Sequence, residues 1–184
     1  MRWRSSRYVV LGLLGGLLAG CASLSEEACR AGDWRGIGYS DGSDGRSEDY
    51  VSAHAKACAE VGITPDFAAW RAGRDAGLGA YCTPRRAYAA GRRGDRLNPV
   101  CHGFDQRELA RANYAGLREY EINRDIDQVE DQIRAANWRI DELRDGDTSK
   151  ADRSEIRRLR RDIERWRREL YRLDTDRRFG PMWY

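Results

Sequence analysis

The sequence is short of the residues that most catalytic sites need, because only two of its 184 residues are histidine. Histidine is the side chain that most readily exchanges protons near pH 7, so little material is present for acid–base catalysis. The sequence also lacks a Gly-x-Ser-x-Gly segment, a phosphate-binding glycine loop and a recognisable pair of catalytic carboxylates. We therefore expect no catalytic residue, no cofactor and no enzymatic activity.

The sequence has no apolar run long enough for a permanent transmembrane helix, which needs about 20 residues. The apolar stretch Val9–Leu18 follows three arginines and leads into Leu-Ala-Gly-Cys, which ends at Cys21. This pattern resembles the lipobox of bacterial lipoproteins, in which small residues precede the cysteine that is modified. An ordinary signal peptide or an uncleaved anchor, with a cysteine there by chance, is the alternative.

The lipobox resemblance implies that residues 1–20 are a signal peptide and that Cys21 carries the lipid. In such lipoproteins the cysteine sulfur takes a diacylglyceryl group, and the new amino terminus takes a further acyl chain such as palmitate. Each buried methylene contributes about 0.8 kcal/mol, so this anchor holds the protein at a membrane almost permanently. Ala22, in place of Asp after the cysteine, favours the outer membrane, facing the periplasm. The inner membrane and the cell surface are the alternatives.

The charge of the chain is balanced once the signal peptide is removed. Three arginines leave with residues 1–20, so 30 basic and 30 acidic residues remain. The isoelectric point of about 8.6 therefore belongs mostly to the signal peptide. A nucleic-acid partner, which needs a basic domain, is not expected.

Four cysteines follow Cys21: Cys29, Cys58, Cys82 and Cys101. An even number of cysteines in an oxidising compartment indicates two disulfides. Three pairings are possible, and we favour the two that are local in sequence, Cys29 with Cys58 and Cys82 with Cys101. The alternative is a zinc site that includes the two histidines, His54 and His102. Because the chain has no Cys-x-x-Cys pair, we expect no metal.

Residues 29–104 are rich in glycine and aromatic residues, and residues 21–28 form a tether before them. Aromatic residues are followed there by spaced glycines, as in Trp34-x3-Gly38-x3-Gly42, Trp70-x2-Gly73-x3-Gly77 and Tyr88-x2-Gly91-x2-Gly94. Glycine in mid-helix costs about 1 kcal/mol relative to Ala, so its repetition predicts close helix packing or left-handed turns. We expect a small disulfide-stapled helical domain, with helices at about 31–42, 49–61, 66–79 and 84–92. Its core should contain Trp34, Tyr39, Trp70, Tyr81 and Tyr88.

These motifs resemble a group of proteobacterial lipoproteins known as domain of unknown function 2799. The resemblance covers roughly residues 29–120. It rests on Asp33-Trp34, Gly38-Tyr39-x-Asp41-Gly42-x2-Gly45, His54-x3-Cys58, Pro65-Asp66 and Gly73-Arg74-x2-Gly77-Leu78-x2-Tyr81-Cys82-Thr83-Pro84. Members usually have Pro after the last cysteine, where this chain has His102. The resemblance implies a disulfide-bonded lipoprotein and no particular chemistry, because the family has no established activity.

Two places in the glycine-rich region could be binding sites. The acidic loop 41–49 invites a calcium site, but alignment of Gly45 with the turn glycine of an EF-hand puts Val51 where a glutamate ligand is required. We expect a helix-to-helix turn there, capped by Asp and Ser side chains, and a His54 that packs on a helix face. The second place is a candidate binding surface that consists of Trp70, Arg74, Asp75 and Tyr81. A structural ion pair between the arginine and the aspartate is its alternative.

Residues 105–178 are charged and follow a seven-residue repeat, which is typical of a coiled coil. Apolar residues recur at spacings of four and three in two runs. The first run is Ile122, Ile126, Val129, Ile133, Ala136, Ile140 and Leu143, and the second is Ile156, Leu159, Ile163, Trp166, Leu170 and Leu173. The connection between them is short, so we predict an antiparallel coiled-coil hairpin with Ser149 as a helix cap. The predicted fold class is therefore all-α.

The two arms of this hairpin carry opposite charge. Residues 119–147 contain 10 acidic and 4 basic residues, whereas residues 153–178 contain 11 arginines and 6 acidic residues. We expect ion pairs between the arms to set their pairing, although an exposed pair contributes only about 0–1 kcal/mol. The alternative for the arginine-rich arm is a patch for lipopolysaccharide or phosphate, which requires that arm to be uncovered. The apolar tail 179–184 either folds back on the hairpin or docks to a partner.

The combined features predict a lipid-anchored envelope protein of structural or adaptor type, which presents its hairpin to another envelope protein. Self-association through the heptad seams is also compatible with the repeat, because the repeat alone does not set the number of strands. The alternative is a binding module for peptidoglycan or lipopolysaccharide, which acts through arginine and aromatic residues of the cysteine-rich domain. Removal of residues 120–176 would abolish the specific contact in the first case only.

Overall fold

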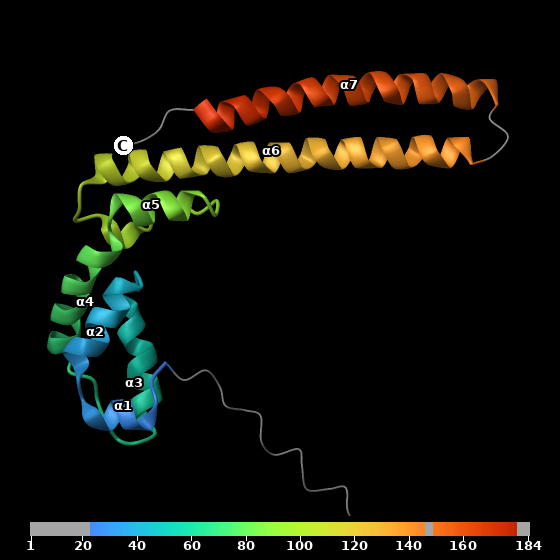
Figure 1. Ribbon diagram of the computed structural model, residues 1–184. Coiled ribbons are helices and arrows are strands. Elements are labelled where there is room, and N and C mark those ends of the chain that lie inside the picture. Colours follow the sequence, from blue (N-terminus) through green and yellow to red (C-terminus); the bar gives the residue numbers. More distant parts are fainter. Residues whose placement is uncertain (1–22, 146–148, 180–184) are drawn as a thin grey trace, which may run out of the picture. The chain divides into compact units, whose positions relative to one another are not determined.

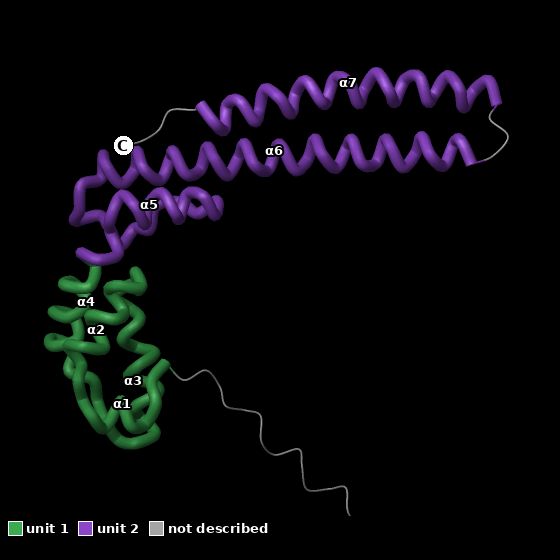
Figure 2. Tube along the Cα trace, in the orientation of Figure 1, with its two compact units in different colours: residues 1–78 green, residues 79–184 purple. Residues whose placement is uncertain are grey.

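The computed structural model describes residues 23–145 and 149–179, and this part of the chain is helical, with no strand. Figure 1 shows the helices in chain order. They are α1 (Glu26–Ala31), α2 (Trp34–Ser43), η1 (Glu48–Tyr50), α3 (Val51–Ala59), α4 (Phe67–Tyr81), α5 (Pro84–Gly91), η2 (Pro99–Cys101), α6 (Gln106–Arg144) and α7 (Lys150–Phe179). The predicted all-α class is confirmed. The chain divides into two compact units, residues 1–78 and 79–184 (Figure 2).

The units divide between Leu78 and Gly79, in the last turn of α4, and not near residue 104, where the composition changes. Helix α5 packs along the charged helix α6 and belongs to the same unit, although its composition resembles that of the preceding helices. Helix α1 also begins inside the predicted tether 21–28. The signal peptide, Cys21 and the tail beyond Phe179 lie outside the described residues. No described helix is both long enough and apolar enough to cross a membrane.

Side-chain caps begin three helices of the first unit. Ser25, Asp33 and Asp66 each accept a hydrogen bond from the backbone N–H three residues later, at the starts of α1, α2 and α4. The first N–H groups of a helix have no partner within the helix, so these side chains satisfy them. The caps explain why short helices begin at these positions.

The predicted glycine stripes bring α2 and α4 into backbone contact. A Cβ atom added at Gly38 would collide with the carbonyl oxygen of Trp70, and Gly42 is in the same situation one turn later. The contact is reciprocal, because Gly73 and Gly77 on α4 face the backbone of α2 equally closely. Glycine is required here for close approach, since any side chain would hold the two helices apart.

The core of the first unit joins a disulfide to two tryptophans. Cys29 and Cys58 are bonded, with their Cα atoms 5.5 Å apart, which is the pairing favoured from the sequence. Trp34 and Trp70 pack in the same cluster and are buried, as predicted. Tyr39 was also expected in the core, but its side chain is exposed because it points away from the glycine face of α2.

The second unit repeats this construction at α5 and α6. Gly91 on α5 and Gly116 on α6 each lie against the backbone of the other helix, so that a Cβ atom at either would collide with a carbonyl oxygen. Cys82 and Cys101, with Cα atoms 5.5 Å apart, form the second predicted disulfide. In the chain-entropy model each of the two disulfides contributes about 3–4 kcal/mol.

Polar side chains also tie α5 to α6. The buried amide of Asn113 donates hydrogen bonds to the carbonyl oxygens of Ala87 and Asp95, both at 3.0 Å. Tyr88, which is half-buried rather than fully in the core, donates its hydroxyl hydrogen to Glu119. This helix pair is therefore held by backbone contact and by directed hydrogen bonds.

Helices α6 and α7 lie side by side and antiparallel (Figure 1). The Arg139 guanidinium near the end of α6 lies 3.1 Å from Glu155 near the start of α7, and Arg177 near the end of α7 lies 3.5 Å from Asn123. Every residue of the two predicted apolar runs is buried or half-buried. The helical hairpin is thus present, and its coiled-coil geometry stays a prediction.

In the described residues of the hairpin, the ion pairs lie mostly within one helix and not between the arms, where the opposite charges predicted them. The pair that joins them, Arg139 with Glu155, has its arginine on the acidic arm. Most other pairs of the hairpin lie within one helix, three or four residues apart. Those of α7 are Arg165–Asp162, Arg167–Glu164, Arg177–Asp174 and Arg178–Asp174. Net charge misled the prediction because it does not reveal that a carboxylate one turn away satisfies an arginine first.

Helix α7 begins at the predicted cap. The backbone N–H of Asp152 donates to the Ser149 hydroxyl, and the Asp152 carboxylate accepts from the backbone N–H of Ser149 at 2.8 Å. Hydrogen bonds from the Ser149 side chain and backbone lower the pKa of Asp152 below its ordinary value. The reciprocal pair is a capping box, and it sets where the second arm starts.

Candidate functional site

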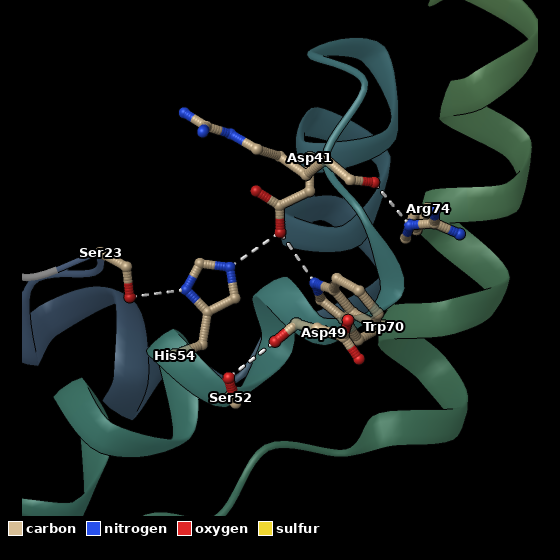
Figure 3. A network of polar contacts seen from close by, with 8 residues as sticks. Ser23, Asp41, Asp49, Ser52, His54, Trp70 and Arg74 are labelled. Atoms are coloured by element: carbon tan, nitrogen blue, oxygen red, sulfur yellow. Dashed lines mark hydrogen bonds and ion pairs between the residues drawn. The ribbon is translucent and has the colours of Figure 1, made fainter. Parts of the chain in front are cut away.

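Four polar side chains from separate segments meet inside the first unit (Figure 3). His54 Nε2 lies 2.8 Å from Asp41 Oδ2, and Trp70 Nε1 lies 2.8 Å from the same oxygen. The other ring nitrogen of His54, Nδ1, lies 2.9 Å from Ser23 Oγ. His54 is 1% exposed and Trp70 is 0% exposed. We call these four residues the His54 network.

The partners of Asp41 determine the direction of the hydrogen bonds to its carboxylate. The indole of Trp70 can only donate, so Asp41 Oδ2 is an acceptor, and the same oxygen accepts the Nε2 hydrogen of His54. The Ser23 hydroxyl can donate to Nδ1 or accept from it, so it satisfies this nitrogen in either case. Every polar atom that the network buries therefore has a partner, which is the condition for burying it without a large cost.

The packing of the first unit positions this network. Asp41 directly precedes Gly42, so the glycine contact between α2 and α4 carries its carboxylate to Trp70. His54 lies one turn before Cys58 on α3, whose disulfide holds that helix against α1. Ser23 lies just before α1. The close helix crossing and the disulfide thus bring distant residues to one point.

Serine, histidine and aspartate are also the residue types of a hydrolase triad, but the arrangement differs from one. In that triad the serine contacts Nε2 and the aspartate contacts Nδ1, whereas His54 has these two partners exchanged. The imidazole is almost fully buried, and Asp41 is shared with an indole. The geometry is that of a clamp which fastens Ser23 to the core.

Two residues of the His54 network can be compared with the predictions from the sequence. A packed rather than reactive His54 agrees with the structure, whereas Asp41 is not a cap of an exposed turn but a buried residue of α2. The available signal was that Asp41 and His54 both occur in the motifs on which the family resemblance rests, whereas Trp70 lies outside them. Spacing along the chain could not show that the three side chains converge.

The four residues of the candidate binding surface do not form a surface. Trp70 is enclosed in the His54 network, and Arg74 is 7% exposed. Arg74 Nε donates to the carbonyl oxygen of Arg46 at 2.8 Å, and its Nη1 donates to Asp75 at 3.2 Å. The alternative prediction, a structural ion pair, therefore describes this position. Tyr81 is half-buried in the second unit.

A small recess lies in the second unit beside its disulfide. It holds about 10 Å³ of open space, which suffices for about one water molecule. Its lining includes Tyr81, Cys82, Arg86, Leu97 and Leu109. A recess of this size is too small for an organic ligand.

The cysteines that a zinc site would need are bonded to one another in the two disulfides. Cys29, Cys58, Cys82 and Cys101 are all disulfide-bonded, so none of them offers a thiolate. In the described part of the chain, no three His, Cys, Asp or Glu side chains are grouped so as to hold a metal ion.

The outer face of α6, opposite the apolar seam, is acidic and aromatic. Spacings of seven, four and seven place the same side outward along about 27 Å of helix. We call it the acidic face, and its exposed residues are Tyr120, Asp127, Asp131 and Trp138. Trp138 is 68% exposed, which is unusual for so large an apolar side chain.

The outer face of α7 carries the opposite charge. Spacings of four, seven and four place four arginines in one sector of the helix, opposite its apolar seam. We call it the arginine face, and its exposed residues are Arg157, Arg161, Arg168 and Arg172. The hairpin therefore presents an acidic outer surface on one helix and a basic one on the other.

These features define the class of protein: a disulfide-linked, all-α protein with a buried histidine network and a charged helical hairpin. The family model described as "Protein of unknown function (DUF2799)" matches residues 33–118. This stretch, which runs from the cap of α2 into α6, is similar to that family and includes the motifs on which the resemblance rests. Comparisons with curated proteins and with solved structures give no match.

Proposed function

We propose that this protein is a lipid-anchored component of the bacterial envelope, of structural or adaptor type, which presents its helical hairpin to another envelope protein. The anchor is an acylated Cys21 that follows a signal peptide, in the outer membrane and facing the periplasm. The sequence pattern at residues 9–21 supports this location. No catalytic step is part of the proposal.

The observation that carries the proposal is the exposed Trp138 on the acidic face of α6. A tryptophan with two thirds of its surface in water leaves much apolar area uncovered, and tryptophan is among the residues that dominate protein interfaces. Asp127 on the same face would favour a partner with a basic surface, because complementary charge sets specificity and association rate, whereas Asp131 is already paired with Arg134. The occupant that we propose is therefore a basic surface of another envelope protein.

The structure offers less to the alternative of a peptidoglycan or lipopolysaccharide module in the cysteine-rich region. Two residues proposed for that role, Trp70 and Arg74, are used inside the first unit. Neither side chain is therefore presented to an envelope polymer.

A photocrosslinking amino acid at position 138 in living cells tests the proposal. We expect one protein of defined mass to be joined at this position and not at Lys56, an exposed position on α3. The partner should also co-purify with the full chain in stoichiometric amount, and be lost when residues 120–176 are removed or when both Tyr120 and Trp138 are changed to Ala.

A double variant with Tyr39→Ala and Tyr114→Ala is the matched control, because it removes two exposed aromatic rings from outside the acidic face. It should retain the partner. Loss of the partner from this control, or retention after removal of residues 120–176, would show that the hairpin is not the contact surface.

A further inference from the structure

The arginine face of α7 is the strongest charged feature that the adaptor proposal leaves unused. At 100° per residue, its four arginines fall within about 60° of one another and span about 22 Å along the helix. The buried residues Ile156 and Ile163 lie on the opposite side, against α6. The packing of the hairpin therefore turns all four guanidinium groups outward in one line.

These four arginines have no carboxylate partner in the described residues. Neighbouring arginines such as Arg165 and Arg167 pair with acidic residues one turn away, but Arg157, Arg161 and Arg168 do not. Arg172 is also without one. The only carboxylate in the same sector is Glu164, which Arg167 engages at 2.8 Å. The positive charge of this face is thus not consumed inside the protein.

Exposed aromatic rings accompany the arginines. Tyr171 is 78% exposed at the edge of the arginine face, and Phe179 is 81% exposed in line with it, seven residues after Arg172. Basic residues beside aromatic rings on one side of a helix are typical of helices that lie on a membrane, where aromatic rings prefer the interface. Binding of a soluble anion would need the basic residues but not the exposed aromatic rings.

We propose that the outer face of α7 binds the phosphate groups of an anionic membrane surface, so that the hairpin lies along the bilayer with its arginine face toward the lipid. A straight line of guanidinium groups with no recess between them suits a plane of many phosphates better than a single small ligand. The acidic face of α6 then points away from the membrane, because it lies on the other side of the hairpin. The proposal goes beyond the adaptor function and does not depend on the Trp138 partner.

Full-length protein reconstituted in lipid vesicles tests this contact, with photoreactive benzoylphenylalanine in place of Tyr171. Because the N-terminal segment attaches the chain in every case, the readout is the lipid joined at position 171. Vesicles of phosphatidylcholine with about a third phosphatidylglycerol should give several-fold more lipid adduct than pure phosphatidylcholine, and added salt should reduce the adduct.

Substitution of the arginines separates this contact from general proximity to the vesicle. Each basic residue at an anionic surface changes partitioning by about five-fold, so R168Q alone should lower the adduct by about that factor. The fourfold variant R157Q/R161Q/R168Q/R172Q should reach the level of phosphatidylcholine. The matched control R124Q/R134Q/R165Q/R167Q removes the same charge from ion-paired arginines and should retain the adduct.

Three outcomes would overturn the proposal: equal adduct in both kinds of vesicle, equal loss in the two fourfold variants, or a protein rather than a lipid joined at position 171 in cells. If the fourfold variant loses helicity, R168Q and the salt dependence of the unsubstituted arginine face still decide. Failure of the adaptor proposal is seen separately, at position 138.

Discussion

Two regions of this chain build helical structure by opposite packing rules. In residues 23–118 the helices approach until their backbones touch at glycines, and disulfides and buried hydrogen bonds hold them there. In the hairpin, residues 119–179, longer apolar side chains stand between the helices, and no polar side chain of its described residues is buried. The first region should tolerate no added atom at its contacts, whereas the hairpin should tolerate any substitution that preserves apolar volume.

The largest effect is expected from Gly38→Val. Its Cβ atom would meet the backbone oxygen of Trp70, and backbone cannot give way as a side chain does, so we expect a loss of about 4 kcal/mol or more. Thermal unfolding followed by circular dichroism measures this. Gly79→Ala is the matched control on α4, because nothing lies within 4 Å of its Cβ position, and it should gain about 1 kcal/mol. A Gly38→Val protein as stable as the parent would contradict the backbone contact.

The next effect is expected from Asp41→Ala. This change leaves the His54 Nε2 hydrogen and the Trp70 indole hydrogen buried without an acceptor, at about 1–3 kcal/mol each. The free energy of unfolding in urea should therefore fall by about 2–6 kcal/mol. The exposed Asp44→Ala is the control and should change it by less than about 0.5 kcal/mol. If the two variants lose similar amounts of unfolding free energy, the buried hydrogen bonds of Asp41 do not stabilise the first region.

A somewhat smaller effect is expected in the hairpin from Ile163→Ala, at about 2–4 kcal/mol, because the cavity can be filled in part by neighbouring side chains. Ile163→Leu keeps the volume and should cost less than about 1.5 kcal/mol. Urea unfolding of both variants measures the difference. If Leu costs as much as Ala, the seam is as shape-specific as the glycine contacts, and the contrast between the regions fails.

The smallest effect is expected from Ser149→Ala, at about 1 kcal/mol, because α7 loses its cap. The hydrogen bonds from Ser149 lower the pKa of Asp152, so this carboxylate stabilises the fold above the ordinary carboxyl pKa of about 4. That stabilisation is lost as the pH falls through the lowered pKa. The difference in unfolding free energy between Ser149→Ala and the parent should therefore narrow in acid. A difference that stays constant from neutral to low pH would show that the Asp152 carboxylate does not contribute to the cap.

Much of the local architecture could be predicted because its signals lie within one helix. The spaced glycines of α2 and α4 predicted that the backbones of two helices approach closely. The apolar repeat at positions such as Ile140 and Ile156 predicted the apolar seam between α6 and α7. Helix starts followed from capping residues, of which Ser149 is an example. The two local disulfides were favoured among three pairings rather than determined, and the structure selects them.

The candidate sites were harder to predict because each depends on the direction of side chains in three dimensions. Tyr39 and Trp70 both looked like core residues, yet one is exposed and the other is the most buried ring of the first unit. Arg74 looked like a surface residue, but its guanidinium is turned inward to the Arg46 carbonyl. In all three cases the prediction used only residue type and spacing. These do not reveal whether a side chain points into the core or toward solvent.

The sequence by itself determined the helices, the glycine faces and the apolar seam, because these depend on residues three, four or seven positions apart, which a helix brings together whatever surrounds it. Only the tertiary structure decided that His54 and Trp70 share one oxygen of Asp41, and that the described ion pairs of the hairpin lie mostly within one helix, with Arg139–Glu155 joining the arms. Contacts between distant segments depend on how whole helices cross, and a helix crossing is a property of two surfaces rather than of either sequence alone.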